Sequence, residues 1–131
     1  MIKELTVRTS GKEDFVDVTE KVKRILENSN TDEGTVTLFV PHTTAAVTIN
    51  ENADPDVKSD MIRTLNRMVP EDWHYDHMEG NSPAHVKASL VGMSEIVPIQ
   101  RGKMLLGTWQ GIYFCEFDGP RTRKLYIKIS D

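Results

Sequence analysis

The order of strand-type segments limits the fold of this chain more than any other feature of its sequence. Runs rich in β-branched and aromatic residues lie at positions 2–9, 35–40, 45–49, 94–100, 104–117 and 124–130. Helical patterns fall between some of these runs but do not alternate with them one for one. A tight turn, Arg101-Gly102-Lys103, joins two neighbouring runs directly. This arrangement predicts an α+β fold with antiparallel strands.

Capping signals predict where the helices begin and end. Thr19 is expected to be the N-cap of the first helix. Asp54-Pro55 predicts the start of a second helix, in which apolar residues recur at every fourth position as far as Val69. Ser82-Pro83 repeats this cap-then-proline signal, and Gly92 should end the third helix.

The size and charge of the chain are those of one globular domain. A single domain over residues 1–131 is expected. The net charge of −4 is spread over interspersed acidic and basic residues, without the basic patch of nucleic-acid-binding proteins. No apolar run approaches the ~20 residues of a membrane helix, and no signal peptide is visible. Because Cys115 is the only cysteine, no internal disulfide can form, and we expect a cytoplasmic location.

Three histidines mark short polar blocks and are the strongest candidates for chemistry. His42 follows the apolar run 35–40, where we expect one strand bent at this residue, and His77 and His85 flank Gly80-Asn81-Ser82-Pro83. Neutral imidazole is a common transition-metal ligand, and three imidazoles with an open fourth position are typical of a catalytic zinc site. The alternative is three unrelated surface or capping histidines, because the chain has no HExxH or CxxC spacing.

A second candidate region lies at the end of the last hairpin. Two acidic residues, Glu116 and Asp118, precede two arginines, Arg121 and Arg123. These residues form either ordinary ion pairs in a solvated turn or a clamp for an anionic ligand, since the planar fork of arginine suits phosphate and carboxylate. In the run 110–117, both the odd and the even positions are largely apolar, which predicts a strand buried on both faces.

The polar blocks occur in a definite order along the chain. They are His42-Thr43-Thr44-Ala45, Asn50-Glu51-Asn52-Ala53-Asp54, Tyr75-Asp76-His77, Gly80-Asn81-Ser82-Pro83-Ala84-His85, Gly107-Thr108-Trp109-Gln110 and Glu116-Phe117-Asp118-Gly119-Pro120-Arg121. In this order they resemble the YjbQ family over essentially the whole chain, and Gly-Thr-Trp-Gln is its signature block. The resemblance implies a seven-stranded antiparallel β-sandwich with about three helices, a homotrimer, and a weak, secondary thiamine-phosphate synthase activity.

Carried over to this chain, the family's motif positions together with the chemistry of each side chain give a set of expected site residues. The expected metal ligands are His42, His77 and His85; the expected catalytic residues are Glu51, Asp54, Gln110, Glu116 and Asp118; and the expected substrate-binding residues are Asn52, Asn81, Ser82, Trp109, Arg121 and Arg123. Zinc is the first expectation for a divalent metal, with magnesium as the partner of a pyrophosphate.

Two hypotheses about function follow. The first is a small metal-assisted transferase that acts on a phosphorylated or pyrophosphorylated small molecule, with thiamine-phosphate synthesis as an instance. The second is a non-catalytic metal- or ligand-binding trimer in which synthase activity is incidental. An enzyme requires an open metal position that faces a cavity with Glu51 or Arg121 within reach, whereas a binding protein can have a closed site.

Overall fold

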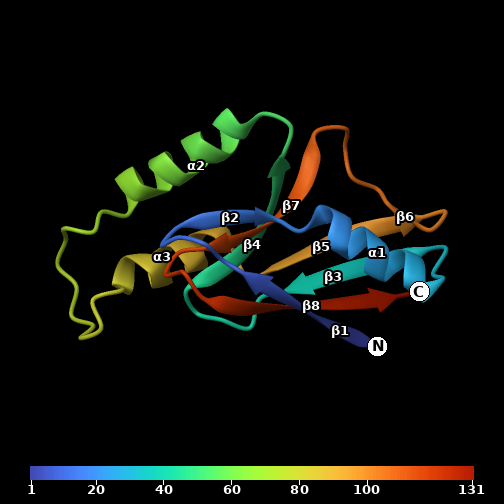
Figure 1. The fold of residues 1–131 in the computed structure, drawn as a ribbon, viewed down its shortest axis with the longest axis horizontal. Helices are drawn as coiled ribbons and strands as arrows, with labels where there is room; N and C mark the ends of the chain where they lie inside the picture. Colours follow the sequence, from blue (N-terminus) through green and yellow to red (C-terminus); the bar gives the residue numbers. More distant parts are fainter.

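Two antiparallel sheets pack against each other in the computed structural model, which describes residues 1–131 (Figure 1). The larger sheet has the strand order β1 (Ile2–Arg8), β8 (Thr122–Ser130), β3 (Gly34–Phe39), β5 (Ser94–Gln100) and β6 (Lys103–Met104). The smaller sheet has the order β2 (Asp14–Asp17), β7 (Gln110–Glu116) and β4 (Ala45–Glu51). The helices are α1 (Thr19–Ser29), α2 (Pro55–Met68) and α3 (Ser82–Val91).

The α+β prediction with antiparallel strands and three helices is confirmed, but the structure has eight strands. Strand β2 was not expected from the sequence, because it is short and begins and ends with an aspartate. The run 104–117 is not continuous: its start belongs to β6 and its end to β7, in different sheets. The connection between them contains the Gly107-Thr108-Trp109-Gln110 block.

The expectation of one strand bent at His42 is wrong. Strand β3 pairs with β5 and β8 in the larger sheet, whereas β4 pairs with β7 in the smaller sheet. His42 therefore lies on a crossover between the two sheets, in the segment 40–44. This position places its side chain at the edge of both sheets, where a loop can contribute to a site.

Strand β7 is buried on both faces, as its residue pattern predicts. Ile112 and Phe114 belong to the core between the sheets, while Tyr113, Cys115 and Phe117 belong to a second cluster that α3 covers. The second face is thus covered within a single chain and does not require a subunit interface. Burial also raises the pKa of the Cys115 thiol, which excludes it as a nucleophile at neutral pH.

The helix ends agree with the sequence signals at two of four positions. Asp54 caps α2, accepting a hydrogen bond from the Asp56 amide at 2.9 Å, and α3 ends at Gly92. Thr19 is not an N-cap but the first residue of α1, and the Asp17 carboxylate accepts from the Thr19 amide instead. Ser82, expected to be the cap of α3, is likewise its first residue, and Asn81 is the N-cap. No helix is long and apolar enough to cross a membrane.

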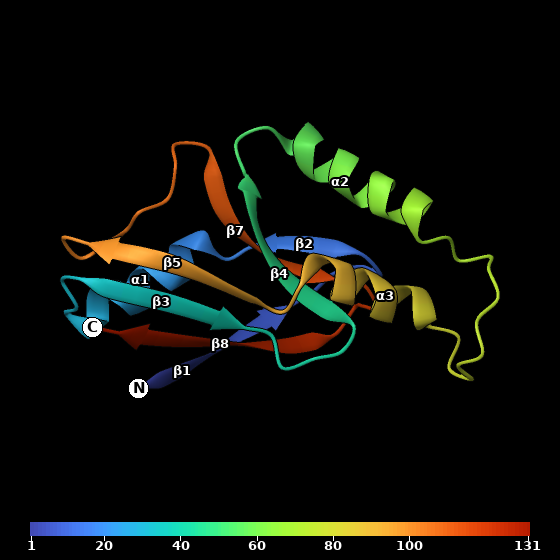
Figure 2. The ribbon, with the colours of Figure 1, turned by 180° about the vertical axis from the view of Figure 1, so that it is seen from behind.

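The two ends of the molecule differ in what they carry. Both chain termini lie at one end, and the segment 70–81 extends from the opposite end, between α2 and α3 (Figure 1 and Figure 2). Helix α2 has no fully buried residue and packs on the smaller sheet through Met61, Ile62 and Leu65. The end with segment 70–81 is where the candidate site lies.

Candidate functional site

Four separate parts of the chain surround an open cavity of about 470 Å³. They are the β3–β4 crossover, the segment before α3, α3 itself and the β7–β8 turn with the start of β8. The lining residues are all polar apart from one proline: Pro41, His42, Thr43, Thr44, His77, Glu79, Asn81, His85, Asp118, Arg121 and Arg123. The three histidines singled out in the sequence therefore line one cavity, together with both arginines.

A buried ion pair anchors the floor of this cavity. The Glu116 carboxylate is fully buried and accepts hydrogen bonds from the Arg123 guanidinium through both of its oxygens, one of them at 2.8 Å from Nε. The Thr9 hydroxyl also donates to Glu116, at 2.9 Å. Burial alone would raise the pKa of Glu116, but the hydrogen bonds from Arg123, the Asp118 amide and Thr9, together with the Arg123 charge, outweigh this effect and lower it. Glu116 stays ionised with both oxygens in use, which does not fit its expected catalytic role.

Arg123 also holds the crossover that carries His42. Its guanidinium donates to the Thr44 hydroxyl at 2.8 Å. With Glu116 and Thr44 as partners of Nε and Nη2, Arg123 positions the cavity wall, and its Nη1, which makes no hydrogen bond within the protein, remains for the phosphate contact expected from the sequence. The Thr44 oxygen accepts from Arg123, so the Thr44 hydroxyl proton remains available to a ligand.

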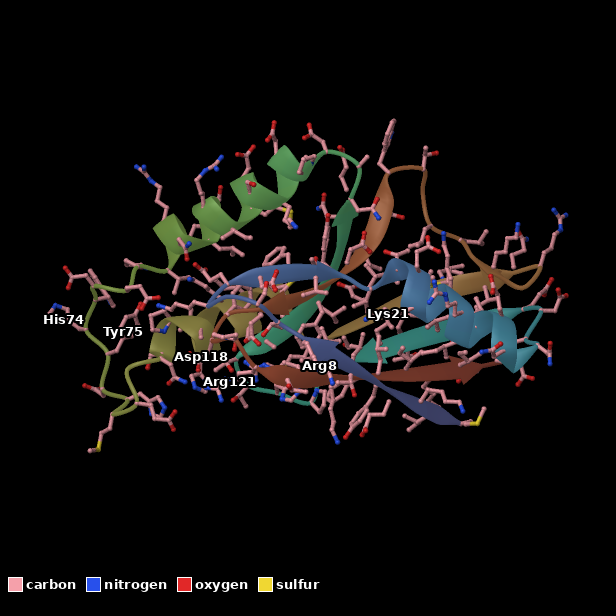
Figure 3. All side chains as sticks on the ribbon, viewed as in Figure 1. Arg8, Lys21, His74, Tyr75, Asp118 and Arg121 are labelled. Atoms are coloured by element: carbon pink, nitrogen blue, oxygen red, sulfur yellow. The ribbon has the colours of Figure 1, made fainter.

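The β7–β8 turn places a second carboxylate and a second arginine at the cavity mouth, where Figure 3 shows Asp118 and Arg121 together. Arg121 donates through Nη2 to the Asp118 carboxylate at 2.9 Å and through Nε to the Asp118 carbonyl at 2.7 Å. Burial acts to raise the pKa of Asp118, but hydrogen bonds from Asn81 and Arg121 lower it. The guanidinium is half-exposed and keeps N–H groups free for an anion.

A close backbone approach sets the position of this turn. The Gly119 amide donates to the Lys12 carbonyl at 3.0 Å, and a side chain at Gly119 would collide with the Gly11 carbonyl oxygen. The neighbouring Glu13 is in turn bound to Lys87 of α3, whose ammonium is buried and lies 2.9 Å from the carboxylate. The segment 10–13 thus ties α3, which carries His85, to the turn that carries Asp118.

Asn81 contributes an amide whose orientation is determined by its neighbour. Its Nδ2 donates to the Asp118 carboxylate at 2.9 Å, so the reversed orientation would place two oxygens against each other. The remaining oxygen, Oδ1, is buried and has no hydrogen-bond partner within the protein. A buried acceptor without a donor is unusual, and it favours a bound water or ligand hydroxyl at this cavity.

The imidazoles of His77 and His85 form a pair. Their ring centroids are 5.4 Å apart and the rings are perpendicular. His77 comes from the segment before α3 and is about half-exposed, with Nε2 at 4.0 Å from the Glu79 carboxylate. His85 projects from the first turns of α3. This pair has the residue types and the proximity to hold a divalent metal ion such as zinc.

His42 does not complete a set of three ligands in this arrangement. Its Nε2 accepts a hydrogen bond from the Lys124 backbone amide at 3.0 Å, which uses the lone pair that a metal would need. Burial and the nearby Arg123 charge lower the pKa of the imidazole, so His42 is neutral at pH 7. No three His, Cys, Asp or Glu side chains are grouped to hold an ion. The expected ligand role of His42 does not fit this geometry.

Comparison with known proteins identifies the family. The model of the family described as UPF0047 protein YjbQ-like matches residues 3–131. The chain is 50% identical to the UPF0047 protein YugU of Bacillus subtilis, with 98% of each chain covered. It is also 50% identical to a UPF0047 protein of Methanocaldococcus jannaschii, with 98% of this chain and 94% of the relative covered. The chain belongs to the YjbQ/UPF0047 family.

Solved structures of similar proteins have the same fold. A YjbQ/UPF0047 family protein of Clostridium acetobutylicum superposes with a TM-score of 0.96 at 51% identity, over 98% of this chain and 99% of that chain. The protein TT1486 of Thermus thermophilus superposes with a TM-score of 0.90 at 40% identity, over 98% and 99% of the two chains. The two-sheet fold with three helices is therefore the YjbQ fold.

Half of the expected YjbQ site residues do not reach the cavity. Those outside its lining are Glu51, Asn52, Asp54, Ser82, Trp109, Gln110 and Glu116. Most of them lie at the far ends of β4 and β7, where Glu51 pairs with Gln110 in the ladder, whereas the cavity end of the same ladder pairs Ala45 with Glu116. Ser82 is the first residue of α3 and does not line the cavity. Their assignment to the pocket is corrected by the structure.

The far-end residues of the YjbQ motif have structural partners outside the cavity. Gln110 closes the preceding turn, because its side-chain oxygen accepts from the Gly107 amide at 2.8 Å. Asn52 donates to the Asp17 carboxylate at 3.0 Å, and its side chain occupies the space beside Gly111 that any Cβ would need. Trp109 is 63% exposed. The signature block is thus a turn and not a substrate pocket within one chain.

Sequence reasoning missed Glu79, Thr43, Thr44 and Thr9 as contributors to the cavity. Thr43 and Thr44 follow His42 directly, so their place in the same block was an available signal. Thr9 gave no signal, because its hydroxyl meets Glu116 across 107 positions of sequence. His74, by contrast, points outward from the segment 70–81, away from Asp118 and Arg121 (Figure 3).

Proposed function

We propose that this YjbQ-family protein is a small metal-assisted enzyme that acts on a phosphorylated or pyrophosphorylated small molecule in the cavity between His42 and Asp118. The observation that supports it is the convergence of three imidazoles, two arginines and an unpaired amide oxygen on one open, polar cavity. Titratable groups from separate segments gathered in one concave site are typical of active sites.

The chemistry of the lining favours a phosphoryl group. Arg121 is half-exposed and its guanidinium has free N–H groups, and Thr43 and Thr44 bring hydroxyl donors to the same cavity. Asp118 holds Arg121 in place by two hydrogen bonds, so the cation is preorganised before a ligand arrives. A cavity of about 470 Å³ accommodates a small phosphorylated metabolite.

A metal ion would occupy the His77 and His85 side of the cavity. When bound, zinc, or magnesium held with a pyrophosphate, neutralises charge that develops on the departing phosphate. The protein supplies the rest: Arg121 binds the phosphate, Asp118 orients Arg121, and Asn81 offers Oδ1 as an acceptor for a substrate hydroxyl. Asp118 is hydrogen-bonded to both Arg121 and Asn81 and orients the two side chains.

Thiamine-phosphate synthesis fits this cavity less well than a fully polar substrate does. Pyrimidine and thiazole rings bind through stacking and apolar contacts, and the lining contains no Phe, Tyr or Trp side chain. Trp109, expected to be a substrate-binding residue, directly precedes β7 at the end of that strand away from the cavity. We therefore propose that thiamine-phosphate synthase activity is secondary. The preferred substrate in this proposal is the phosphate of a sugar-like compound or of a hydroxy acid.

We propose a homotrimer, as the family resemblance implies. Large apolar side chains remain exposed on several elements, among them Met68, Trp73, Leu90 and Trp109. Such exposure favours association between copies of the chain. Light scattering that reports a mass of about 15 kDa at micromolar concentration would contradict the trimer.

An assay of phosphate and pyrophosphate release tests the enzymatic proposal. Purified protein is incubated with zinc or magnesium and a panel of phosphorylated sugars, hydroxy acids and the two thiamine precursors. Arg121→Ala is the inactive variant, and Arg63→Ala, which removes an exposed arginine of α2 outside the cavity, is its control. Release by wild type and the control but not by Arg121→Ala supports an enzyme. Binding of the same compounds without turnover supports the non-catalytic alternative.

A further inference from the structure

The hydrogen bond between Lys124 and His42 determines which nitrogen of the imidazole carries its proton. A backbone amide can only donate, so Nε2 of His42 must present a lone pair to the Lys124 N–H at 3.0 Å. A neutral imidazole has one proton, which must then be on Nδ1. Nδ1 has no hydrogen-bond partner within the protein, and His42 lines the cavity.

The sheet explains why this hydrogen bond forms. Strand β8 pairs with β3 from Tyr126 onward, opposite Phe39. The Lys124 amide lies just beyond the end of that ladder, where no β3 carbonyl is available. The His42 ring, on the crossover that follows β3, takes the place of the missing acceptor. An unpaired amide is costly in a folded protein, so the sheet itself stabilises this tautomer.

The arrangement is the reverse of that at a metal-bound histidine. A ligand imidazole binds the ion through one nitrogen and donates the proton of the other to a carboxylate or carbonyl. In His42, one nitrogen accepts from a donor and the other carries a proton. Neither nitrogen offers a free lone pair, whereas His77 and His85 have no such backbone donor.

We propose that His42 binds a phosphoryl oxygen as a hydrogen-bond donor through Nδ1–H, and that the metal is held on the His77 and His85 side alone. The cavity then has two subsites: a donor subsite of His42, Thr44 and Arg121 for the anion, and an imidazole pair for the cation. The assignment of two subsites rests on the proposed function, because it locates the phosphate of the proposed substrate in the donor subsite.

Two substitutions separate the donor role from a ligand role. His42→Asn keeps an N–H near the position of Nδ1 but loses the acceptor for Lys124, whereas His42→Gln keeps an acceptor near Nε2 and loses the Nδ1 donor. Calorimetric titrations use zinc alone and pyrophosphate alone as probes. We expect both variants to bind zinc within about threefold of wild type, and only His42→Gln to lose about tenfold in pyrophosphate affinity.

Loss of zinc binding by both variants, with pyrophosphate affinity unchanged, would overturn the inference while leaving the proposed function in place. Wild-type protein that binds no pyrophosphate would overturn the proposed function and the anion subsite together. Nitrogen NMR of the wild-type imidazoles gives a measurement that does not depend on variant folding. We expect the His42 signals to show a protonated Nδ1 and an unprotonated Nε2 with and without zinc. A zinc-induced shift at either nitrogen of the size seen on coordination would contradict the proposal.

Discussion

The two ends of the β4–β7 ladder carry polar blocks of similar appearance but different structure. At one end Ala45 pairs with Glu116 beside the cavity, and at the other Glu51 pairs with Gln110. These ends are roughly 20 Å apart, at about 3.3 Å of rise per residue. The far ends of both strands project beside the start of α2, away from the segment 70–81 (Figure 2).

The difference lies in where each polar group finds its partner. At the cavity end, partners come from distant parts of the chain, as when Arg123 binds Thr44 and Asn81 binds Asp118. At the far end, several partners are close in sequence, as when Gln110 binds the Gly107 amide and Asp54 caps its own helix, while Asn52 binds Asp17, 35 positions away, outside the cavity. Convergence from distant segments produces a cavity with an unpaired acceptor, whereas local pairing produces turns and caps. A polar residue near a strand end can therefore either line a cavity or stabilise a turn or a helix cap, and its position near the strand end does not distinguish the two.

Removal of the buried carboxylate should have the largest effect at the cavity end. Glu116→Gln leaves the Arg123 guanidinium buried without its counter-charge, and we expect a loss of about 3 kcal/mol in the free energy of unfolding. Urea denaturation measures the change. Glu4→Gln, which breaks an exposed pair with Lys124, is the control and should cost less than about 1 kcal/mol. Equal effects of the two substitutions would show that the buried pair is not an anchor.

Activity should depend on the cavity carboxylate and not on the far-end one. Asp118→Asn weakens the orientation of Arg121, and we expect turnover of a phosphorylated substrate to fall about 100-fold. Glu51→Gln is the matched substitution at the other end of the ladder and should retain turnover within about threefold, because Glu51 does not line the cavity. If Glu51→Gln lowers turnover and Asp118→Asn does not, the residues at the far end of the ladder form the active site, for example by meeting the cavity of a neighbouring subunit.

The helix cap at the far end should matter for stability alone. Asp54→Ala removes the acceptor for the Asp56 amide, and we expect a loss of about 1 kcal/mol in the free energy of unfolding. Thermal melting measures the loss, and the release assay on the same preparation should give unchanged turnover below the melting range. Asp54→Ser restores an N-cap acceptor and should recover most of the stability. If Asp54→Ala lowers turnover and leaves the free energy of unfolding unchanged, Asp54 has a role in the active site.

The smallest expected effect is a pH dependence that originates at His42. Because its pKa in the folded chain is lowered, by burial first and by the Arg123 charge, the unfolded chain takes up the proton more readily. The contribution of His42 to stability is therefore complete above about pH 6.5 and declines as the pH falls toward the folded-state value. Urea midpoints of wild type and His42→Gln measured between pH 7.5 and about 5 should converge at the acid end. Parallel curves would exclude this linkage.

The sequence alone predicts the local features of this fold, because their causes lie within a few residues. Alternation in the run 110–117 correctly assigns Phe114 and Cys115 to opposite buried faces. Asp54-Pro55 correctly marks the start of α2. Both patterns follow from the period of the strand and from the unpaired amides of a first helical turn.

Tertiary structure decided which polar residues share a site. The segments around His42 and Lys124 are 82 positions apart, and only the placement of β3 beside β8 brings the imidazole to the unpaired amide. The same holds for Asn81 and Asp118, whereas Glu51, only nine positions from His42, lies at the far end of β4. An extended strand carries neighbouring residues apart at about 3.3 Å per residue, while sheet pairing joins distant ones, so proximity in sequence does not measure proximity in this site.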